Sequence, residues 1–304
     1  MNTLFKKVPD SFIGYSIGTI FQIICGSIIG VIIVSLIVVS YVAFGLNVTN
    51  YSNVDVVLSL LPAWVETGAS YLSSIGLWVM GLLWFMRKNN RPLFKSIGTY
   101  VKGNNIKNFV IGLFVGIVLN GACVLVSLMN KDIVIKYQGF NFIQAFLVLL
   151  CVFVQSSGEE LICRGYLYQK LLKKYEKPII AIVGNALLFA LLHFSNSGVT
   201  ILSAINILLA GIVFSLMVYH FDSLWMAMGA HATWNYLQSI VFGLPNSGIK
   251  MRYSIFKLTS ARDGIAYTKS FGVEGSVMVT LLFILVIGGV IFLKKNPHTT
   301  DIWK

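Results

Sequence analysis

The stretch Ser156-Ser157-Gly158-Glu159-Glu160-Leu161-Ile162-Cys163-Arg164-Gly165 places two adjacent carboxylates and an arginine in strongly apolar sequence. The two glutamates directly follow a 22-residue window, 137–158, that contains no charged residue. An ionisable side chain in hydrocarbon costs about 3 kcal/mol or more, so such residues usually face a protein interior or a water-filled cavity. The pair therefore marks either the end of a membrane helix or a functional site within the membrane.

Helix geometry assigns different surroundings to the two glutamates. Glu160 and Arg164 are four residues apart and can form an ion pair on one helix face. Glu159 is rotated from Glu160 by about 100° and is left free for other contacts. We therefore expect Glu160 and Arg164 to have a structural role, and Glu159 to be available for chemistry.

The composition excludes a soluble domain. Of the 304 residues, 57% are hydrophobic and 11% are charged, and the mean hydropathy is +0.81, whereas a soluble domain has about 25% charged residues. The net charge of +12 comes from Lys and Arg in short loops between apolar segments. It therefore indicates membrane orientation and not a nucleic-acid partner.

Charge-free windows long enough to cross a bilayer, which takes about 20 residues, predict an all-α membrane protein with about eight transmembrane helices around a polar cavity. The 178–221 window is interrupted by Ser195-Asn196-Ser197-Gly198 and is expected to contain two of them. The windows are 11–54, 67–86, 108–130, 137–158, 178–221, 223–249 and 275–293.

The loop charges predict the orientation of the chain. With eight spans, 16 Lys and Arg residues fall on the side of both termini and seven on the other side. By the positive-inside rule, both termini of this multi-pass protein are expected in the cytoplasm. The Lys-, Ile- and Asn-rich composition favours a bacterial plasma membrane.

Two histidines fall inside predicted spans, at depths similar to that of Glu159. His193 follows Phe189 by one helical turn, and His231 shares a helix face with Asn235. With a rise of 1.5 Å per residue, Glu159 lies roughly 16 Å before Lys170, His193 roughly 24 Å after Lys177, and His231 roughly 13 Å after Asp222, and these three reference residues are on the predicted cytoplasmic side. Three helices can therefore contribute to one polar cavity within a hydrocarbon core about 30 Å thick.

These residue types fit the hydrolysis of an acyl bond. A carboxylate and a histidine can polarise a water molecule, while a second histidine and an amide donor can stabilise the oxyanion formed when that water attacks a carbonyl. Cys163 and Ser157 are weaker candidates, because a nucleophile needs a positioned base.

The three motifs resemble the CPBP family of CAAX proteases and bacteriocin-processing enzymes, also called the Abi family. They are Glu-Glu-x-x-x-Arg from Glu159, Phe-x-x-x-His at 189–193 and His-x-x-x-Asn at 231–235. The resemblance implies an intramembrane glutamate protease without a cofactor, in which Glu159 is the base and His193 helps it to activate water. By the same resemblance, His231 and Asn235 form the oxyanion site, and Glu160 and Arg164 support the structure.

This reading divides the chain into three regions. Residues 1–136 hold N-terminal transmembrane helices, 137–245 form the catalytic core, and 246–304 hold an extracytoplasmic loop and the last transmembrane helix. The expected activity is cleavage of a membrane-associated peptide or protein at a cytoplasm-facing cavity. Bacteriocin immunity and maturation of a signalling peptide are the expected roles.

Two alternatives remain open at this stage. Glu159, Glu160, His193 and His231 could bind zinc, although no His-Glu-x-x-His motif is present. The protein could also be a transporter or a non-catalytic scaffold that confers immunity, since transporters also carry intramembrane charge. Replacement of Glu159 by Ala separates these classes, because a scaffold would tolerate the change.

Overall fold

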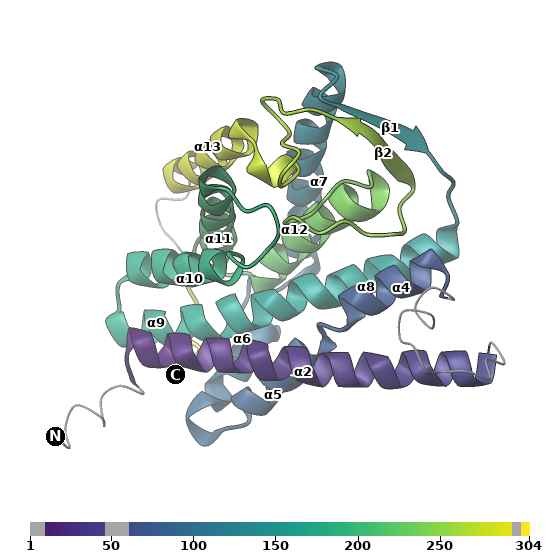
Figure 1. The fold of residues 1–304 in the computed structure, drawn as a ribbon. Helices are drawn as coiled ribbons and strands as arrows, with labels where there is room; N and C mark the ends of the chain where they lie inside the picture. The colour runs from purple at the N-terminus through teal and green to yellow at the C-terminus, as the bar shows by residue number, and fades with distance from the viewer. Residues whose placement is uncertain (1–9, 46–60, 294–298) are drawn as a thin grey trace.

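A computed structural model describes residues 10–45, 61–293 and 299–304, and these are mostly helical (Figure 1). Five helical segments are long and apolar enough to cross a membrane, and two shorter helices are also apolar. The chain is therefore a multi-pass membrane protein. The long segments are α2 (Phe12–Gly45), α4 (Ala63–Leu72) with α5 (Ile75–Phe85), α7 (Ile106–Met129), α8 (Phe142–Glu160) continuing into α9 (Tyr168–Tyr175), and α11 (Ile201–Phe221); the shorter ones are α10 (Pro178–Leu192) and α13 (Val277–Leu293).

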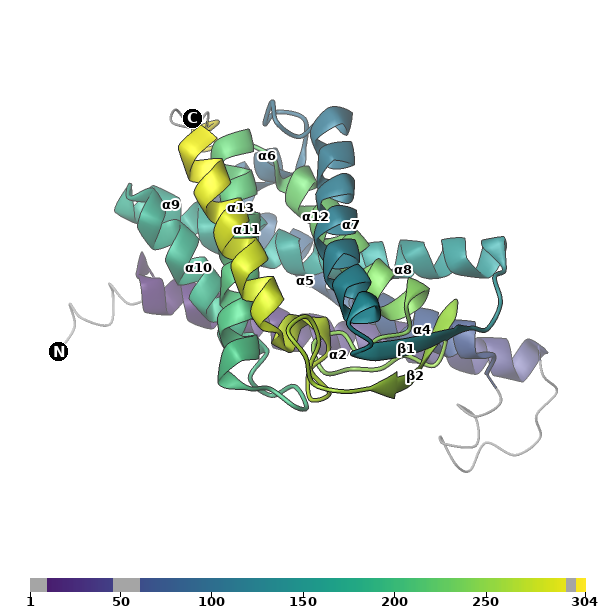
Figure 2. The ribbon, with the colours of Figure 1, turned by 90° about the horizontal axis from the view of Figure 1, so that it is seen from above.

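The seventh expected span, in the window 223–249, corresponds to a shorter, buried helix. Helix α12 (Leu224–Tyr236) continues as a π-helical turn, Leu237–Val241. It packs against α7, α8 and α11, and Figure 2 shows it between α7 and α11. At 1.5 Å per residue its 13 α-helical residues span only about 20 Å of a core about 30 Å thick. This helix is therefore a central packing element of the fold.

A small antiparallel sheet was not anticipated from the sequence. Strand β1 (Ile133–Tyr137) follows α7 and pairs with β2 (Phe256–Ala261), which lies in the segment between α12 and α13. Two ion pairs connect this segment to the helices: Arg252 contacts Glu66 of α4, and Arg262 contacts Asp132 beside β1 at 3.2 Å. The segment expected as an extracytoplasmic loop is therefore attached to the helices at several points.

Helix α8 ends in irregular geometry at the glutamate pair. Its α-helical hydrogen bonding stops at Glu160, and Leu161–Leu167 form a π-helical segment before α9. Such π-helical segments are rare and are frequently found at functional sites. The local change in helical repeat begins where two charged residues must be accommodated inside the protein.

The orientation rests partly on residues outside the described part of the chain. Lys6, Lys7, Lys294 and Lys295 belong to this group. The cytoplasmic location of both termini therefore remains a prediction.

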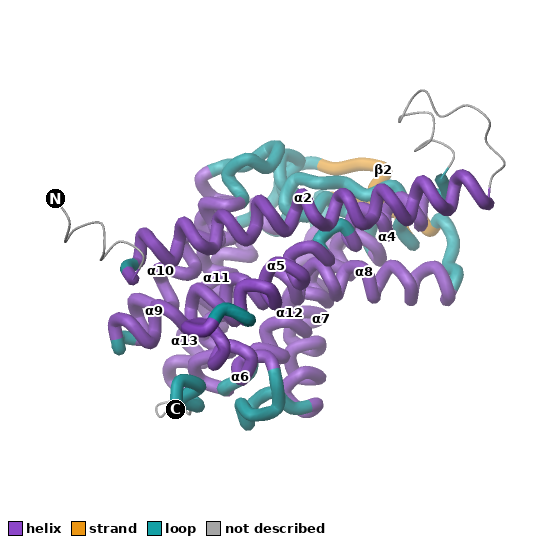
Figure 3. Tube along the Cα trace, turned by 90° about the horizontal axis from the view of Figure 1, so that it is seen from below, coloured by secondary structure: helices purple, strands orange, loops and turns teal. Residues whose placement is uncertain are grey.

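Helix α2 lies along α4 and α5 on one side of the molecule (Figure 3). The contact depends on glycine, because a Cβ on Gly76 would collide with the backbone oxygen of Gly26, and one on Gly30 with that of Ser73. Helices in a lipid bilayer are not driven together by the hydrophobic effect. Their association therefore depends largely on van der Waals packing, which small residues improve by letting the backbones approach closely.

We therefore predict that Gly76→Ala destabilises the protein by about 1–3 kcal/mol, the usual cost of overpacking. Gly121→Ala in α7 is the matched control, because its new Cβ would meet nothing within 4 Å. Thermal unfolding of the purified protein in detergent should show a lower midpoint for Gly76→Ala only. Equal midpoints would contradict the close packing of α2.

Candidate active site

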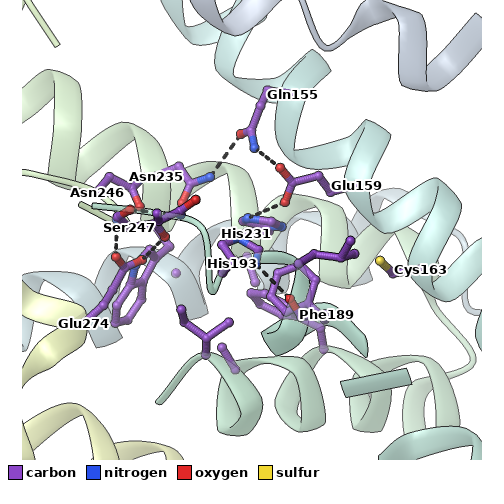
Figure 4. Close-up of a pocket in the computed structure, with 18 of the residues that line it drawn as sticks. Gln155, Glu159, Cys163, Phe189, His193, His231, Asn235, Asn246, Ser247 and Glu274 are labelled. Atoms are coloured by element: carbon purple, nitrogen blue, oxygen red, sulfur yellow. Dashed lines mark hydrogen bonds and ion pairs between the residues drawn. The ribbon is translucent and has the colours of Figure 1, made fainter. Parts of the chain in front are cut away.

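The four residues predicted to be catalytic line one cavity of about 380 Å³ (Figure 4). Glu159 enters it from α8, His193 from the end of α10, and His231 and Asn235 from α12. The shared depth predicted for Glu159, His193 and His231 thus corresponds to a common cavity. The segment between α12 and α13 forms part of its wall and contributes Ser247 and other residues.

Glu159 presents its carboxylate to this cavity in contact with two polar groups. Gln155, one turn earlier on α8, donates a hydrogen bond from Nε2 to Glu159 Oε1. The other oxygen, Oε2, lies 3.8 Å from His231 Nε2 and has no hydrogen-bond partner among the described residues. The side chain as a whole is 25% exposed, but Oε2 itself is buried, so Glu159 combines a fixed position with a buried oxygen that has no hydrogen bond within the described part of the chain.

Glu160 lies in a fully buried ion network. Its Oε1 atom is 2.9 Å from Arg164 Nη1 and also 2.9 Å from His231 Nδ1, and both charged side chains are fully buried. Because an ionised carboxylate only accepts hydrogen bonds, His231 Nδ1 donates to it. This contact leaves His231 Nε2 for the cavity and for Glu159.

Arg164 has a partner for each part of its guanidinium group. Its Nη2 donates to the carbonyl of Gly211 on α11 at 3.0 Å. Its Nε donates at 3.1 Å to Asn185 on α10 when that amide is oriented with its oxygen toward the arginine. The charge therefore bridges α8, α10 and α11.

Aromatic rings hold the two histidines and the arginine in place. Phe214 stacks on the His231 ring with centroids 5.1 Å apart and planes inclined by 18°. Phe189 lies 4.7 Å from the His193 ring, and the Arg164 guanidinium is 4.6 Å from the Phe189 centroid. Cations over aromatic faces are favourable, more so where water is excluded.

His193 lies at a helix end and does not contact Glu159 directly. It follows the last residue of α10, and its Nδ1 is 2.8 Å from the carbonyl oxygen of Phe189. A carbonyl only accepts, so Nδ1 carries the proton and Nε2 is the nitrogen available for chemistry. The structure thus places His231, and not His193, beside the glutamate.

Asn235 contacts a residue that the sequence analysis missed. Its Nδ2 donates to Gln155 Oε1 and Ser156 Oγ, both at 3.1 Å. Gln155 therefore links Asn235 to Glu159 across the cavity. Its spacing of four residues before Glu159 placed it on the same helix face and would have been the signal.

The cavity walls do not fit the expected cytoplasm-facing opening. His193 lies in the turn between α10 and α11, and Ser247 and Glu274 lie in the segment between α12 and α13. Under the orientation predicted from the loop charges, both segments are extracytoplasmic. The cavity consequently lies in the outer half of the protein if that orientation holds.

The structure describes the surroundings of the two candidate nucleophiles and of the candidate zinc ligands. Cys163 is buried, and Ser157 Oγ donates to the carbonyl of Phe153, so neither is paired with a base. Within residues 10–45, 61–293 and 299–304, no three His, Cys, Asp or Glu side chains converge as a metal site.

The cavity of this multi-pass helical protein thus combines a carboxylate, two histidines and an amide, groups that can polarise water and stabilise an oxyanion. Residues 141–237, about a third of the chain, match the family model of the type II CAAX prenyl endopeptidases, Rce1-like. This part of the chain is a domain of that family, and the family implies a protease. Comparisons with curated proteins and with solved structures gave no match.

The buried ion network generates a stability prediction. Arg164→Met should lower the free energy of unfolding by about 3–5 kcal/mol, because it leaves Glu160 buried without its cationic partner. Lys174→Met is the matched control, since its pair with Asp10 is exposed and should contribute less than about 1 kcal/mol. Thermal unfolding and folded yield would measure both, and an unchanged midpoint for Arg164→Met would contradict the structural role.

Proposed function

We propose that the protein is an intramembrane glutamate endopeptidase that hydrolyses a peptide bond of a membrane-associated peptide or protein. The main observation in support of this proposal is the contact of Glu159 with His231 inside a cavity that is also lined by His193 and Asn235. The match to the Rce1-like family supports peptide hydrolysis as the reaction.

In the proposed reaction, Glu159 accepts a proton from a water molecule that attacks the carbonyl carbon. Gln155 donates to one oxygen of this carboxylate, and the other oxygen, which is buried and has no hydrogen bond within the described residues, would accept the proton. His193 Nε2, across the cavity, assists as a second proton acceptor or donor. A general base at this position contributes about 10²–10⁴ in rate.

His231 and Asn235 would stabilise the oxyanion of the tetrahedral intermediate. His231 Nε2 faces the cavity because Glu160 holds Nδ1. The Asn235 amide must exchange a contact with Gln155 or Ser156 for the oxyanion when substrate binds. Collapse of the intermediate breaks the C–N bond, and the proton held by Glu159 passes to the leaving amine.

The physiological setting is part of the same proposal. We place the protein in a bacterial plasma membrane with both termini in the cytoplasm, and we propose bacteriocin immunity or signalling-peptide maturation as its role. The loop charges and the lysine-rich composition support this setting.

Glu159→Gln should strongly reduce cleavage and leave folding intact. The amide keeps the size of the side chain but cannot act as a base, so the expected loss in kcat is about 10²–10⁴. The measurement is cleavage of a quenched fluorescent peptide library by purified wild-type and mutant proteins, with equal thermal midpoints as the control.

The same assay distinguishes the alternatives. Activity that persists with a zinc chelator supports glutamate chemistry, whereas its loss would support the zinc-dependent form. An intact immunity or signalling phenotype in cells that carry Glu159→Gln would instead indicate a non-catalytic scaffold.

Asn235→Ala should lower kcat by about 10²–10³, the usual scale for losing one oxyanion donor. KM should change little, because the donor acts mainly on the charge that develops during the reaction. The side chain makes two contacts within the protein, so the thermal midpoint must be measured in parallel. A rise in KM with unchanged kcat would assign Asn235 to substrate binding.

A further inference from the structure

A second carboxylate, Glu274, faces the cavity from outside the family domain. It lies in the short helical turn Val273–Gly275 just before α13 and lines the cavity together with Glu159 and His193. The family match ends at residue 237, so the motifs of that domain assign no role to Glu274.

The carboxylate of Glu274 is held by three donors. Ser247 donates to it from its backbone N–H and from Oγ, the latter at 3.4 Å, and Trp234 of α12 donates from Nε1 at 3.3 Å. Its backbone carbonyl accepts from Asn206 of α11 at 2.8 Å. Glu274 therefore attaches the turn at Ser247 to two helices of the core.

The turn at Ser247 also contacts the segment that carries His193. Asn196 donates from Nδ2 to the carbonyl of Ser247 at 3.0 Å, and its backbone N–H donates to the carbonyl of His193 at 3.0 Å. A continuous chain of contacts thus runs from Glu274 through Ser247 and Asn196 to His193.

Backbone packing reinforces this connection. A Cβ on Gly248 would collide with the carbonyl oxygen of Ser197, and one on Gly198 with that of Ser270. Both glycines have positive φ angles, 83° and 77°, which other residues rarely adopt. The two segments consequently meet backbone to backbone, without side chains to absorb a displacement.

His193 needs such external support. It lies beyond the end of α10, where the backbone continues as a turn in which the His193 N–H donates to the carbonyl of Ala190 at 3.0 Å. Among the contacts described above, its ring is held by Phe189 alone. Misplacement of a catalytic group by about 1 Å can cost about 10²-fold in rate.

We infer that Glu274 is a positioning residue that holds the His193 turn in place through Ser247 and Asn196. The catalytic consequence rests on the proposed protease function, whereas the positioning itself does not. Burial raises the pKa of Glu274, and the Ser247 N–H and the attraction of His193 oppose this rise. Both oxygens of Glu274 accept hydrogen bonds from the protein. The anchoring therefore depends on two acceptor oxygens, and a side chain of the same size with only one would not replace it.

Glu274→Gln tests the inference, because one oxygen replaced by NH₂ leaves either the Ser247 N–H or the Trp234 N–H without its acceptor. Hydrogen–deuterium exchange of the full-length protein in detergent should become at least about 10-fold faster at the amides of His193, Phe194 and Asn196. Glu66→Gln is the matched control, since Glu66 anchors the same segment through Arg252 away from the cavity and should leave these amides unchanged.

Asn196→Ala provides a second, independent variant. It removes the link to Ser247 and leaves Glu274 with all three of its donors, so it should accelerate the same amides even if Glu274→Gln fails to fold. Unchanged exchange at these amides, or equal acceleration along the whole chain, would overturn the inference.

Activity measurements connect the positioning to catalysis. With the best-cleaved peptide of a quenched fluorescent library, Glu274→Gln should lower kcat about 10- to 100-fold with little change in KM. In a His193→Ala background it should cause no further loss, because it acts through His193; additive losses would contradict the inference. If the wild type cleaves no peptide, the proposed function fails, and the exchange experiment still decides the positioning.

Discussion

The burial of Glu160 and Arg164 is the constraint on which the rest of the site depends. Removing one partner of such a pair costs about 3–5 kcal/mol, because the remaining charge has no water to solvate it. Both side chains are fully buried, and their contacts reach Gly211 on α11 and His231 on α12. These helices therefore have little freedom to shift relative to α8.

The same network gives the adjacent residues Glu159 and Glu160 different surroundings, although their side chains are chemically identical. Glu160 is engaged by Arg164 and His231, whereas Glu159, one residue earlier, points about 100° away into the cavity. The structural glutamate also sets the orientation of His231, whose Nε2 then faces Glu159. Compared with apolar residues of similar size, an intact buried ion pair adds little net stability. The value of the Glu160–Arg164 pair therefore lies in the positions that it gives to Glu159 and His231.

Residue spacing predicted the helical class, the Glu160–Arg164 pair and the convergence of Glu159, His193 and His231, because helical periodicity and depth are properties of local sequence. It did not predict the β1–β2 pairing, which joins segments more than 100 residues apart through backbone groups. Nor did it indicate Glu274, whose position depends on how the segment after α12 folds back over the cavity. The short length of α12 was also missed, because a charge-free window does not reveal where a helix ends.

The cavity wall suggests how proton transfer is possible in hydrocarbon. Among the described residues that line it, the ionisable carboxylates are Glu159 and Glu274 and the histidines are His193 and His231, with no Lys or Arg. A site of low dielectric penalises any change in net charge. In the proposed reaction, a proton that moves from water to Glu159 and then to the leaving amine redistributes charge without adding any to the cavity. The proposed mechanism therefore keeps the net charge of the cavity constant during the reaction, as a low-dielectric site requires.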